Sequence, residues 1–268
     1  MRKVAKPVSL NFWPIYKREL RTISHSSSTY IALGLFFLVS GAVYHSIMVG
    51  FVHDTVASKA SPVADAPQNI NLAVIQQTFR TIAGMILFTI PILSMRLIAE
   101  ERSTGTFEVL MVCPIGDWSI LLGKYFAQVT LGLIVVLLCS IYPITTYFLG
   151  RAQGAIPDVS IVIACYLGLF FIFSTYSAFG LMTSSLTRSQ ATAAILALIG
   201  LLLWNMLGDM PASNPFIQDI IHELSPMRHT DNFTSGFFSS KDLAFYGLTS
   251  CLFLFVAARA LESRRWRI

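Results

Sequence analysis

The sequence predicts an all-α polytopic membrane protein with six transmembrane helices, and three observations lead to that class. Of the 268 residues, 54% are hydrophobic and only 12% are charged, whereas a soluble domain carries about 25% charged residues. Six apolar stretches approach or exceed the length of about 20 residues that crosses a bilayer core. The Lys and Arg residues gather at the ends of these stretches and not on one face, so no nucleic-acid partner is expected. The expected spans are 29–51, 81–99, 119–149, 159–186, 190–208 and 243–261.

The segment before the first span, 1–28, is expected to be a cytoplasmic tail that includes an amphipathic helix in the headgroup layer. Aromatic side chains there would lie in the interface, and cations would face anionic membrane lipids. A merely basic flank that sets the topology is the alternative. The residues assigned to this interfacial helix are Trp13, Tyr16, Lys17, Arg18 and Arg21.

The membrane domain is expected over 29–261. Its third stretch contains Pro143, which predicts a kink or an extension beyond the bilayer, and its fifth stretch is only just long enough to cross. Polar side chains inside the third and fourth stretches are expected to form interhelical hydrogen bonds, with the lining of a substrate pathway as the alternative. These side chains are Tyr142, Thr145, Thr146, Thr175 and Tyr176.

The distribution of basic residues predicts the orientation. Segments 2–21, 96–124, 188 and 259–267 hold 14 of the 19 Lys and Arg residues, and such segments face the cytoplasm. Both termini are therefore expected inside, with a basic cytoplasmic tail over 262–268. Two loops are expected outside: 52–80, which looks irregular, and 209–242, in which 214–224 could form a short amphipathic helix.

A charged insert over 100–118 stands between the second and third spans. Charges cannot lie in lipid without a large free-energy penalty, so the insert must project into the cytoplasm. An acidic pair and a turn precede a short run with one apolar face, which is a form that suits a partner's groove. The residues assigned to this contact are Glu100, Glu101, Arg102, Gly105, Thr106, Phe107, Glu108, Leu110 and Pro114.

Catalytic and metal-binding patterns are incomplete in this chain. Gly123-Lys124 resembles the end of a phosphate-binding loop, but Trp118 stands where the first Gly is needed. His222-Glu223 opens like a zinc motif, but Pro226 replaces the second His. We therefore expect no enzymatic activity, no catalytic residue, no metal and no cofactor in this chain.

The run EERSTGTFEVLMVCPIGDWSILLGKYFA resembles the segment between the second and third spans of type-2 ABC transporter permeases. The N-terminal KRELRTISHSSSTYIALGLFFLVSG resembles the start of the same permeases. The C-terminal HELSPMRHTDNFTSGFFSSKDLAFYGLTS resembles their gliding-motility-associated (Gld-type) branch. The likeness covers nearly the whole chain.

This resemblance implies a six-span exporter permease of the bacterial inner membrane. It would pair with a second permease subunit, as a homodimer or heterodimer, and with ABC ATPase subunits that carry ATP and Mg. The insert would be the coupling helix, and ATP hydrolysis would drive substrate export or force transduction. The branch also implies a companion protein with an extracytoplasmic domain.

Two other functions stay open at this stage. One is a secondary transporter or channel that works without an ATPase, although the spans lack the mid-depth charges that mark proton and ion paths. The other is a structural membrane scaffold of a secretion or motility complex.

Overall fold

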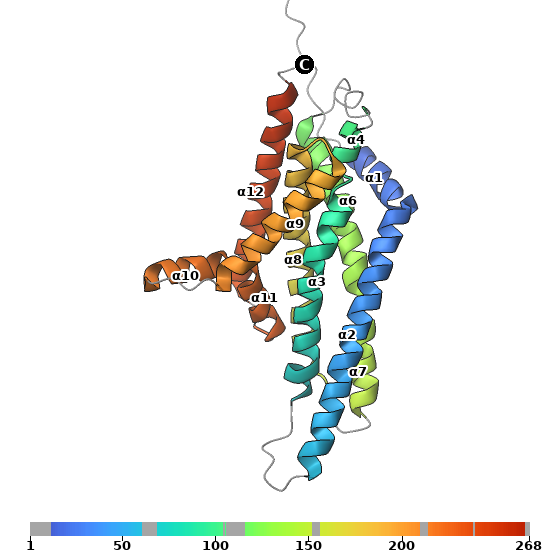
Figure 1. Ribbon diagram of the computed structural model, residues 1–268, viewed down its shortest axis with the longest axis vertical. Coiled ribbons are helices and arrows are strands. Elements are labelled where there is room, and N and C mark those ends of the chain that lie inside the picture. Colours follow the sequence, from blue (N-terminus) through green and yellow to red (C-terminus); the bar gives the residue numbers. More distant parts are fainter. Residues whose placement is uncertain are drawn as a thin grey trace, which may run out of the picture.

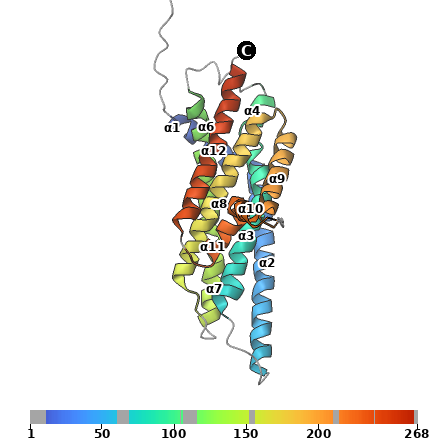
Figure 2. The same ribbon diagram turned by 90° about the vertical axis from the view of Figure 1, so that its left-hand side faces the viewer.

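The computed structural model describes residues 12–60, 69–103, 105, 116–151, 156–209, 214–237 and 239–265. All regular elements in these ranges are helices, and the longest of them form an elongated bundle (Figure 1). We call the end of the bundle that holds α1, α4 and the C-terminal end of α12 the upper end. The opposite end, where α2 and α7 finish, is the lower end (Figure 2).

Among the described residues, five apolar segments are long enough to cross a membrane: Ser27–Val56, Asn71–Ser103, Asp117–Arg151, Val159–Leu186 and Ser240–Ser263. They belong to α2 (Ser27–Ala60), η1 (Asn71–Gln76) with α3 (Gln77–Ser94) and α4 (Ala99–Ser103), α6 (Asp117–Leu138) with α7 (Ile141–Arg151), α8 (Val159–Leu186) and α12 (Ser240–Arg265). The expected fifth span corresponds to α9 (Gln190–Met206), an apolar helix of 17 residues. Five candidate spans are therefore found, and the sixth stays a prediction.

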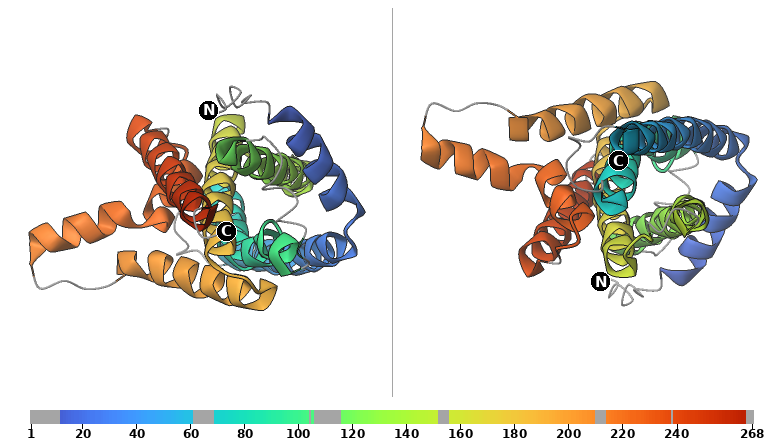
Figure 3. Two further views of the ribbon diagram at one scale, coloured as in Figure 1. Left: turned by 90° about the horizontal axis from the view of Figure 1, so that it is seen from above. Right: turned by 90° about the horizontal axis from the view of Figure 1, so that it is seen from below.

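Helix α8 is the centre of the bundle, with α3, α6, α9, α11 and α12 packed around it (Figure 3). Its sequence is apolar on all sides, as expected for a helix without a polar face. Ile172, Phe173 and Tyr176 are at most 1% exposed. The core of the molecule therefore forms around α8.

The third apolar stretch is broken in its middle. Helix α6 ends at Leu138, and α7 begins at Ile141, two residues before Pro143. A proline ring clashes with the carbonyl group four residues earlier, which here belongs to Cys139. The kink expected from Pro143 is confirmed at this point.

A second break separates α3 from α4 at Met95–Ile98. The backbone N–H groups of Ile98 and Ala99 donate to Ser184 Oγ of α8, at 3.1 and 3.0 Å. The side chain of α8 thus replaces the helical acceptors that the turn removes. This contact fixes the start of α4 against the central helix.

The expectation of an irregular segment over 52–80 is wrong for its described parts. Helix α2 continues to Ala60, and helix resumes with the π-helical η1 at Asn71. The apolar stretch of the sequence marks only the part of α2 that is suited to lipid. The backbone hydrogen bonds of the helix continue beyond that stretch.

The expected helix near 214–224 is present as α10 (Pro215–Leu224), whose N-terminus is capped by Asn214. After η2 (Leu207–Asp209), α10 projects sideways from the bundle (Figure 1). Helix α11 (Pro226–Thr234) was not expected from the sequence. Its His229 Nδ1 lies 2.5 Å from Asp242 Oδ1, which joins α11 to the start of α12.

Helix α1 (Trp13–His25) lies at the upper end and packs against α6. Gly123 of α6 allows this close approach, because a Cβ atom added there would lie 2.8 Å from Ile15 Cγ2. Tyr16 Oη and Thr130 Oγ1, 3.0 Å apart, form a second link between the two helices. Ser26 then connects α1 to α2.

Candidate functional site

A buried lysine joins three elements at the upper end. The ammonium group of Lys124 in α6 lies 2.8 Å from Glu19 Oε1 of α1 and 3.0 Å from Glu101 Oε1 of α4. The side chain of Lys124 is 1% exposed, and those of Glu19 and Glu101 are 9% and 15% exposed. We call these three residues the Lys124 cluster.

Such a cluster is stable only as a complete set. A buried ion loses several kcal/mol of hydration, and close partners must compensate for that loss. Two carboxylates face one ammonium group, and Arg18 Nη2 approaches Glu101 Oε1 to 3.8 Å as a second cation. The charges of the two cations and the two carboxylates balance, so the position of each side chain depends on the others.

The positions of the three residues in their helices orient their side chains toward one another. Glu19 follows Ile15 by four residues, so both side chains lie on the face of α1 that is turned to α6. Lys124 follows Gly123, a point of close approach between these helices. The short α4 presents Glu101 from the third side.

Two arginines fix α4 to its neighbours. Arg96 Nη1 donates to Ser26 Oγ at 2.8 Å, at the junction of α1 and α2. Arg102 Nη1 donates to the carbonyl oxygens of Ser185 and Thr187 at the end of α8. Charged side chains therefore anchor α4, the helix that precedes segment 104–116, to α1, α6 and α8.

Three residues of the predicted insert contact are part of this arrangement. Glu101 belongs to the Lys124 cluster, Arg102 contacts the end of α8, and Glu100 Oε2 lies 3.7 Å from Arg96 Nε. Gly105 has a φ of +73°, a left-handed conformation that favours glycine. Five other residues assigned to this contact lie outside the described residues: Thr106, Phe107, Glu108, Leu110 and Pro114.

The aromatic and basic residues expected on an interfacial helix are on α1. The rings of Trp13 and Tyr16 stack at 5.2 Å, and Lys17 Nζ lies 5.5 Å from the centre of the Trp13 ring. Arg18 and Arg21 are exposed. The placement of this helix at a membrane surface stays a prediction.

The polar side chains inside the spans form interhelical hydrogen bonds. Tyr142 Oη lies 2.6 Å from Ser40 Oγ. Tyr44 Oη lies 2.9 Å from Thr146 Oγ1 and 2.8 Å from Thr145 Oγ1. These contacts join α2 to α7. A role in lining a pathway stays a prediction.

Two further polar residues, both on α8, link that helix to its neighbours. The Thr175 hydroxyl lies 3.0 Å from Ser250 Oγ of α12, and Tyr176 Oη donates to Asn205 Oδ1 of α9 at 2.8 Å. For these residues too, the pathway role stays a prediction.

Sequence reasoning did not find Glu19 and Lys124 as site residues. Glu19 stands in a basic segment, and Lys124 stands near the start of an apolar span. The signal in the sequence was a lone cation inside the apolar run 119–138. A charge in such a position requires a partner, although the sequence does not say which one.

Two comparisons relate this chain to known proteins. The profile described as "ABC-2 family transporter protein" matches residues 13–261, from the start of α1 to the last turns of α12. The "Probable multidrug ABC transporter permease YbhS" of Escherichia coli strain K12 is 32% identical over 107 residues. The protein of the same name from Escherichia coli O157:H7 has the same identity over the same length. The matched segment is 40% of this chain and 26% of each relative, so the chain aligns with about a quarter of their length.

Proposed function

Because the chain belongs to the ABC-2 family of transporter proteins, we propose that it is the membrane-spanning permease subunit of an ABC exporter. The ATPase of the complex is a separate chain, which binds ATP and Mg²⁺. The permease pairs with a second permease subunit, either another copy or a related chain. The chain itself contributes no catalytic group and holds no cofactor.

The proposed topology has six spans, with the upper end in the cytoplasm of a bacterial cell and the spans in its inner membrane. Helix α9 has 17 residues. A transmembrane helix needs about 20 residues, with about 17 as the lower end of the range. The basic residues of α1, the 96–124 segment and the end of α12 support this orientation. In this arrangement α1 lies in the cytoplasmic headgroup layer.

The observation that carries the proposal is the Lys124 cluster. It lies where α4 leads into segment 104–116, the part of the chain that we assign to ATPase contact. Glu101 faces Lys124, so we assign Glu101 to transmission and not to direct contact with the ATPase. A displacement of segment 104–116 would be transmitted to α1 and α6 through the paired charges, and to α8 through Arg102.

In the proposed mechanism, closure of the ATPase pair on ATP moves segment 104–116 together with α1. Close-packed helices respond as rigid bodies, so the spans tilt and reshape the interface between the two permease subunits. The buried ion pairs keep α1, α4 and α6 in register during this movement, because separating them would expose uncompensated charge in a dry site.

The C-terminal likeness supports a finer assignment to the Gld-type branch. In that case a companion protein with an extracytoplasmic domain would complete the complex on the outer side. The complex would then export a substrate or transmit force across the membrane.

The test is a measurement of ATP-driven movement in the complex. Tagged protein is purified from its native membrane with any ATPase that binds it, and spin labels are placed at exposed positions 21 in α1 and 259 in α12. We expect the distance between the labels to change when ATP and vanadate trap the closed ATPase. In Lys124→Met the ATPase should still bind, whereas the population that shifts should fall about tenfold, the effect of about 1.4 kcal/mol.

Lys241→Met provides the matched control, because Lys241 is an exposed lysine at the opposite end of α12. That variant should move like the wild type. Absence of any co-purifying ATPase would refute the permease assignment. A normal distance change in Lys124→Met would remove the cluster from the transmission path.

A further inference from the structure

A cavity of about 480 Å³ opens at the upper end between α1, α2, the α3–α4 turn and α6. Its volume is typical of sites that bind small molecules or cofactors. Three cations and three carboxylates line it, so at neutral pH their formal charges cancel. They are Arg18, Arg96, Lys124, Glu19, Glu100 and Glu101.

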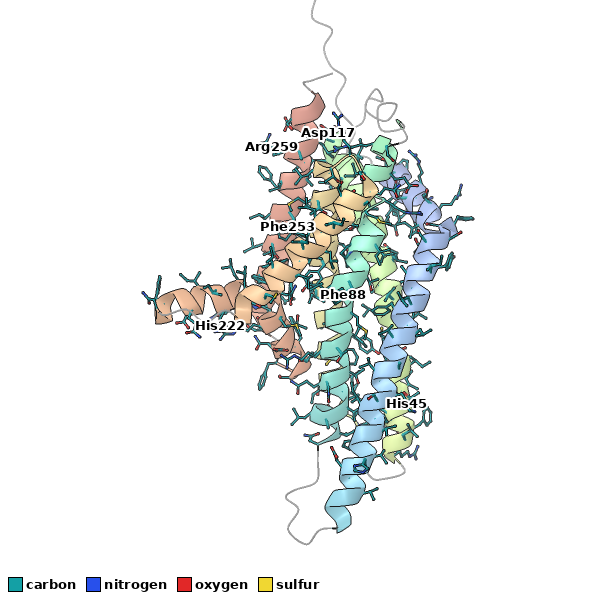
Figure 4. The ribbon with its side chains drawn as sticks, in the orientation of Figure 1. His45, Phe88, Asp117, His222, Phe253 and Arg259 are labelled. Atoms are coloured by element: carbon teal, nitrogen blue, oxygen red, sulfur yellow. The ribbon has the colours of Figure 1, made fainter. Side chains whose placement is uncertain are left out.

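An apolar groove of about 230 Å³ runs along α2 and α3. Leu35 and Val39 of α2 are 58% and 38% exposed, and Phe88 and Ile92 of α3 are 56% and 40% exposed. Figure 4 shows Phe88 about midway along α3. Apart from Thr89, the residues that line the groove are apolar.

The cavity and the groove adjoin each other along the same two helices. On α3, Ile92 lines the groove and Leu93 lines the cavity, and Arg96, in the turn after α3, lines the cavity as well. On α2, Ala32 lines the groove and Thr29 lines the cavity, a separation of nearly one helical turn. A charged chamber therefore meets an apolar channel at Arg96.

Arg96 lies at this meeting point with its side chain 38% exposed. Its Nη1 binds Ser26, but its buried Nε forms no hydrogen bond with the described part of the chain. The Glu100 Oε2 atom lies 3.7 Å from this Nε, which is an ion contact without a hydrogen bond. A partly exposed guanidinium group is well suited to phosphate, because its planar set of N–H donors matches the phosphate oxygens.

We propose that the cavity and the groove together bind one phospholipid with a zwitterionic phosphoethanolamine head. The phosphate lies against Arg96 and Arg18, the amine lies against Glu100, and one acyl chain occupies the groove between α2 and α3. A balanced set of charges matches a head that carries both signs, whereas an anionic head would bring uncompensated charge. The apolar, exposed groove supplies the place for the chain.

One phospholipid would fill both the charged cavity and the apolar groove. A second copy of the protein could cover the apolar groove, but it would leave the charged chamber at Arg96 without a matching group. The proposal goes beyond the permease function and does not depend on it, because lipid binding is measured on the permease alone.

The experiment uses the full chain, stripped of lipid in detergent, and titrates dioleoylphosphatidylethanolamine with native mass spectrometry and thermal unfolding as readouts. We expect one lipid per chain and a higher unfolding midpoint. Arg96→Gln keeps a donor for Ser26 but removes the charge, and Val39→Trp fills the groove. Each should weaken binding about tenfold, as expected for the loss of one charge-assisted contact or of the chain site.

Arg96→Lys keeps the charge, so binding between wild type and Arg96→Gln is expected if the guanidinium geometry matters. Arg188→Gln, at the same end of the bundle but outside the site, should bind like wild type. A thermal unfolding transition measured without lipid shows that each variant is folded before its binding is compared.

Several results would overturn the proposal. These are no retained lipid in the wild type, equal or tighter binding of dioleoylphosphatidylglycerol, or a loss in Val39→Trp with no change in Arg96→Gln. The last would mean acyl adsorption without head recognition. Efficient disulfide crosslinking of Leu35→Cys between two copies, unaffected by added lipid, would show that a second copy fills the groove.

Discussion

At the scale of single residues, the described part of the fold buries ionisable side chains in two places, and each place uses side chains from separate elements. At the upper end, Lys124 meets two carboxylates from segments before it in the chain. Near the start of α12, His229 meets Asp242. In both places the burial is tolerable because several partners compensate for lost hydration.

The partners of His229 hold its ring between α10 and α12. Its Nδ1 lies 2.5 Å from Asp242 Oδ1, and its Nε2 lies 3.0 Å from the carbonyl oxygen of Glu223. The side-chain amide of Asn232 also donates to both Asp242 oxygens. Loss of the imidazole would therefore leave the buried Asp242 side chain with fewer hydrogen-bond partners.

The prediction at this scale is that His229→Ala lowers the free energy of unfolding by about 3–5 kcal/mol, because it leaves the Asp242 carboxylate buried with one fewer partner. Chemical denaturation in detergent measures the change. The control is His222→Ala on α10, where the imidazole Nε2 lies 3.4 Å from Gln218 Nε2. This control should change the free energy of unfolding by no more than about 0.5 kcal/mol, as surface substitutions usually do. Equal stability of the two variants would show that the contact between His229 and Asp242 does not stabilise the fold.

At the scale of elements, the apolar stretches locate the long helices well. The sequence also predicts the kink before Pro143 and the short helix α10, because proline chemistry and amphipathic spacing are local properties. Helix α11 was missed because its sequence, PMRHTDNFT, is polar. Two of its polar side chains contact α12, where Thr230 binds Tyr246 and His229 binds Asp242, and no local pattern reveals those partners.

In the candidate site too, the sequence predicts local features but not the contacts between distant residues. The charged insert predicts that Glu100, Glu101 and Arg102 lie outside the lipid. The contact between Glu19 and Lys124, 105 positions apart, depends on how α1 packs against α6. A single sequence carries little information about such a long-range pair, because neither residue belongs to a motif with fixed spacing.

The packing of α1 against α6 yields the prediction at this scale. Gly123→Ala should push α1 away, because the new Cβ would come within 2.8 Å of Ile15 Cγ2. Overpacking of this kind destabilises by about 1–3 kcal/mol. Hydrogen–deuterium exchange should report faster exchange of the α1 amides. Gly34→Ala on α2, where the added atom meets nothing within 4 Å, should leave that exchange unchanged.

At the scale of the whole molecule, the lengths and charges of the helices lead to a topology that can be measured. Reporter fusions after Arg151 and after Lys241 should read outside, and fusions after Arg102 and at Ile268 should read inside. The reason is the concentration of Lys and Arg at the upper end. A cytoplasmic signal from a fusion within 209–242 would refute six spans, because α9 would then not cross.

The unequal lengths of α2 and α9 have a consequence for the surrounding bilayer. Helix α2 has 34 residues and α9 has 17 residues. At about 1.5 Å per residue, these helices are about 51 Å and about 26 Å long. The hydrocarbon core is about 30 Å thick. In the proposed six-span topology, lipids beside α9 would therefore face a hydrophobic mismatch of a few ångströms, at a fraction of a kcal/mol per ångström. Helix α10, which projects sideways with Phe216 and Ile220 exposed, lies where the thinned leaflet would meet the protein.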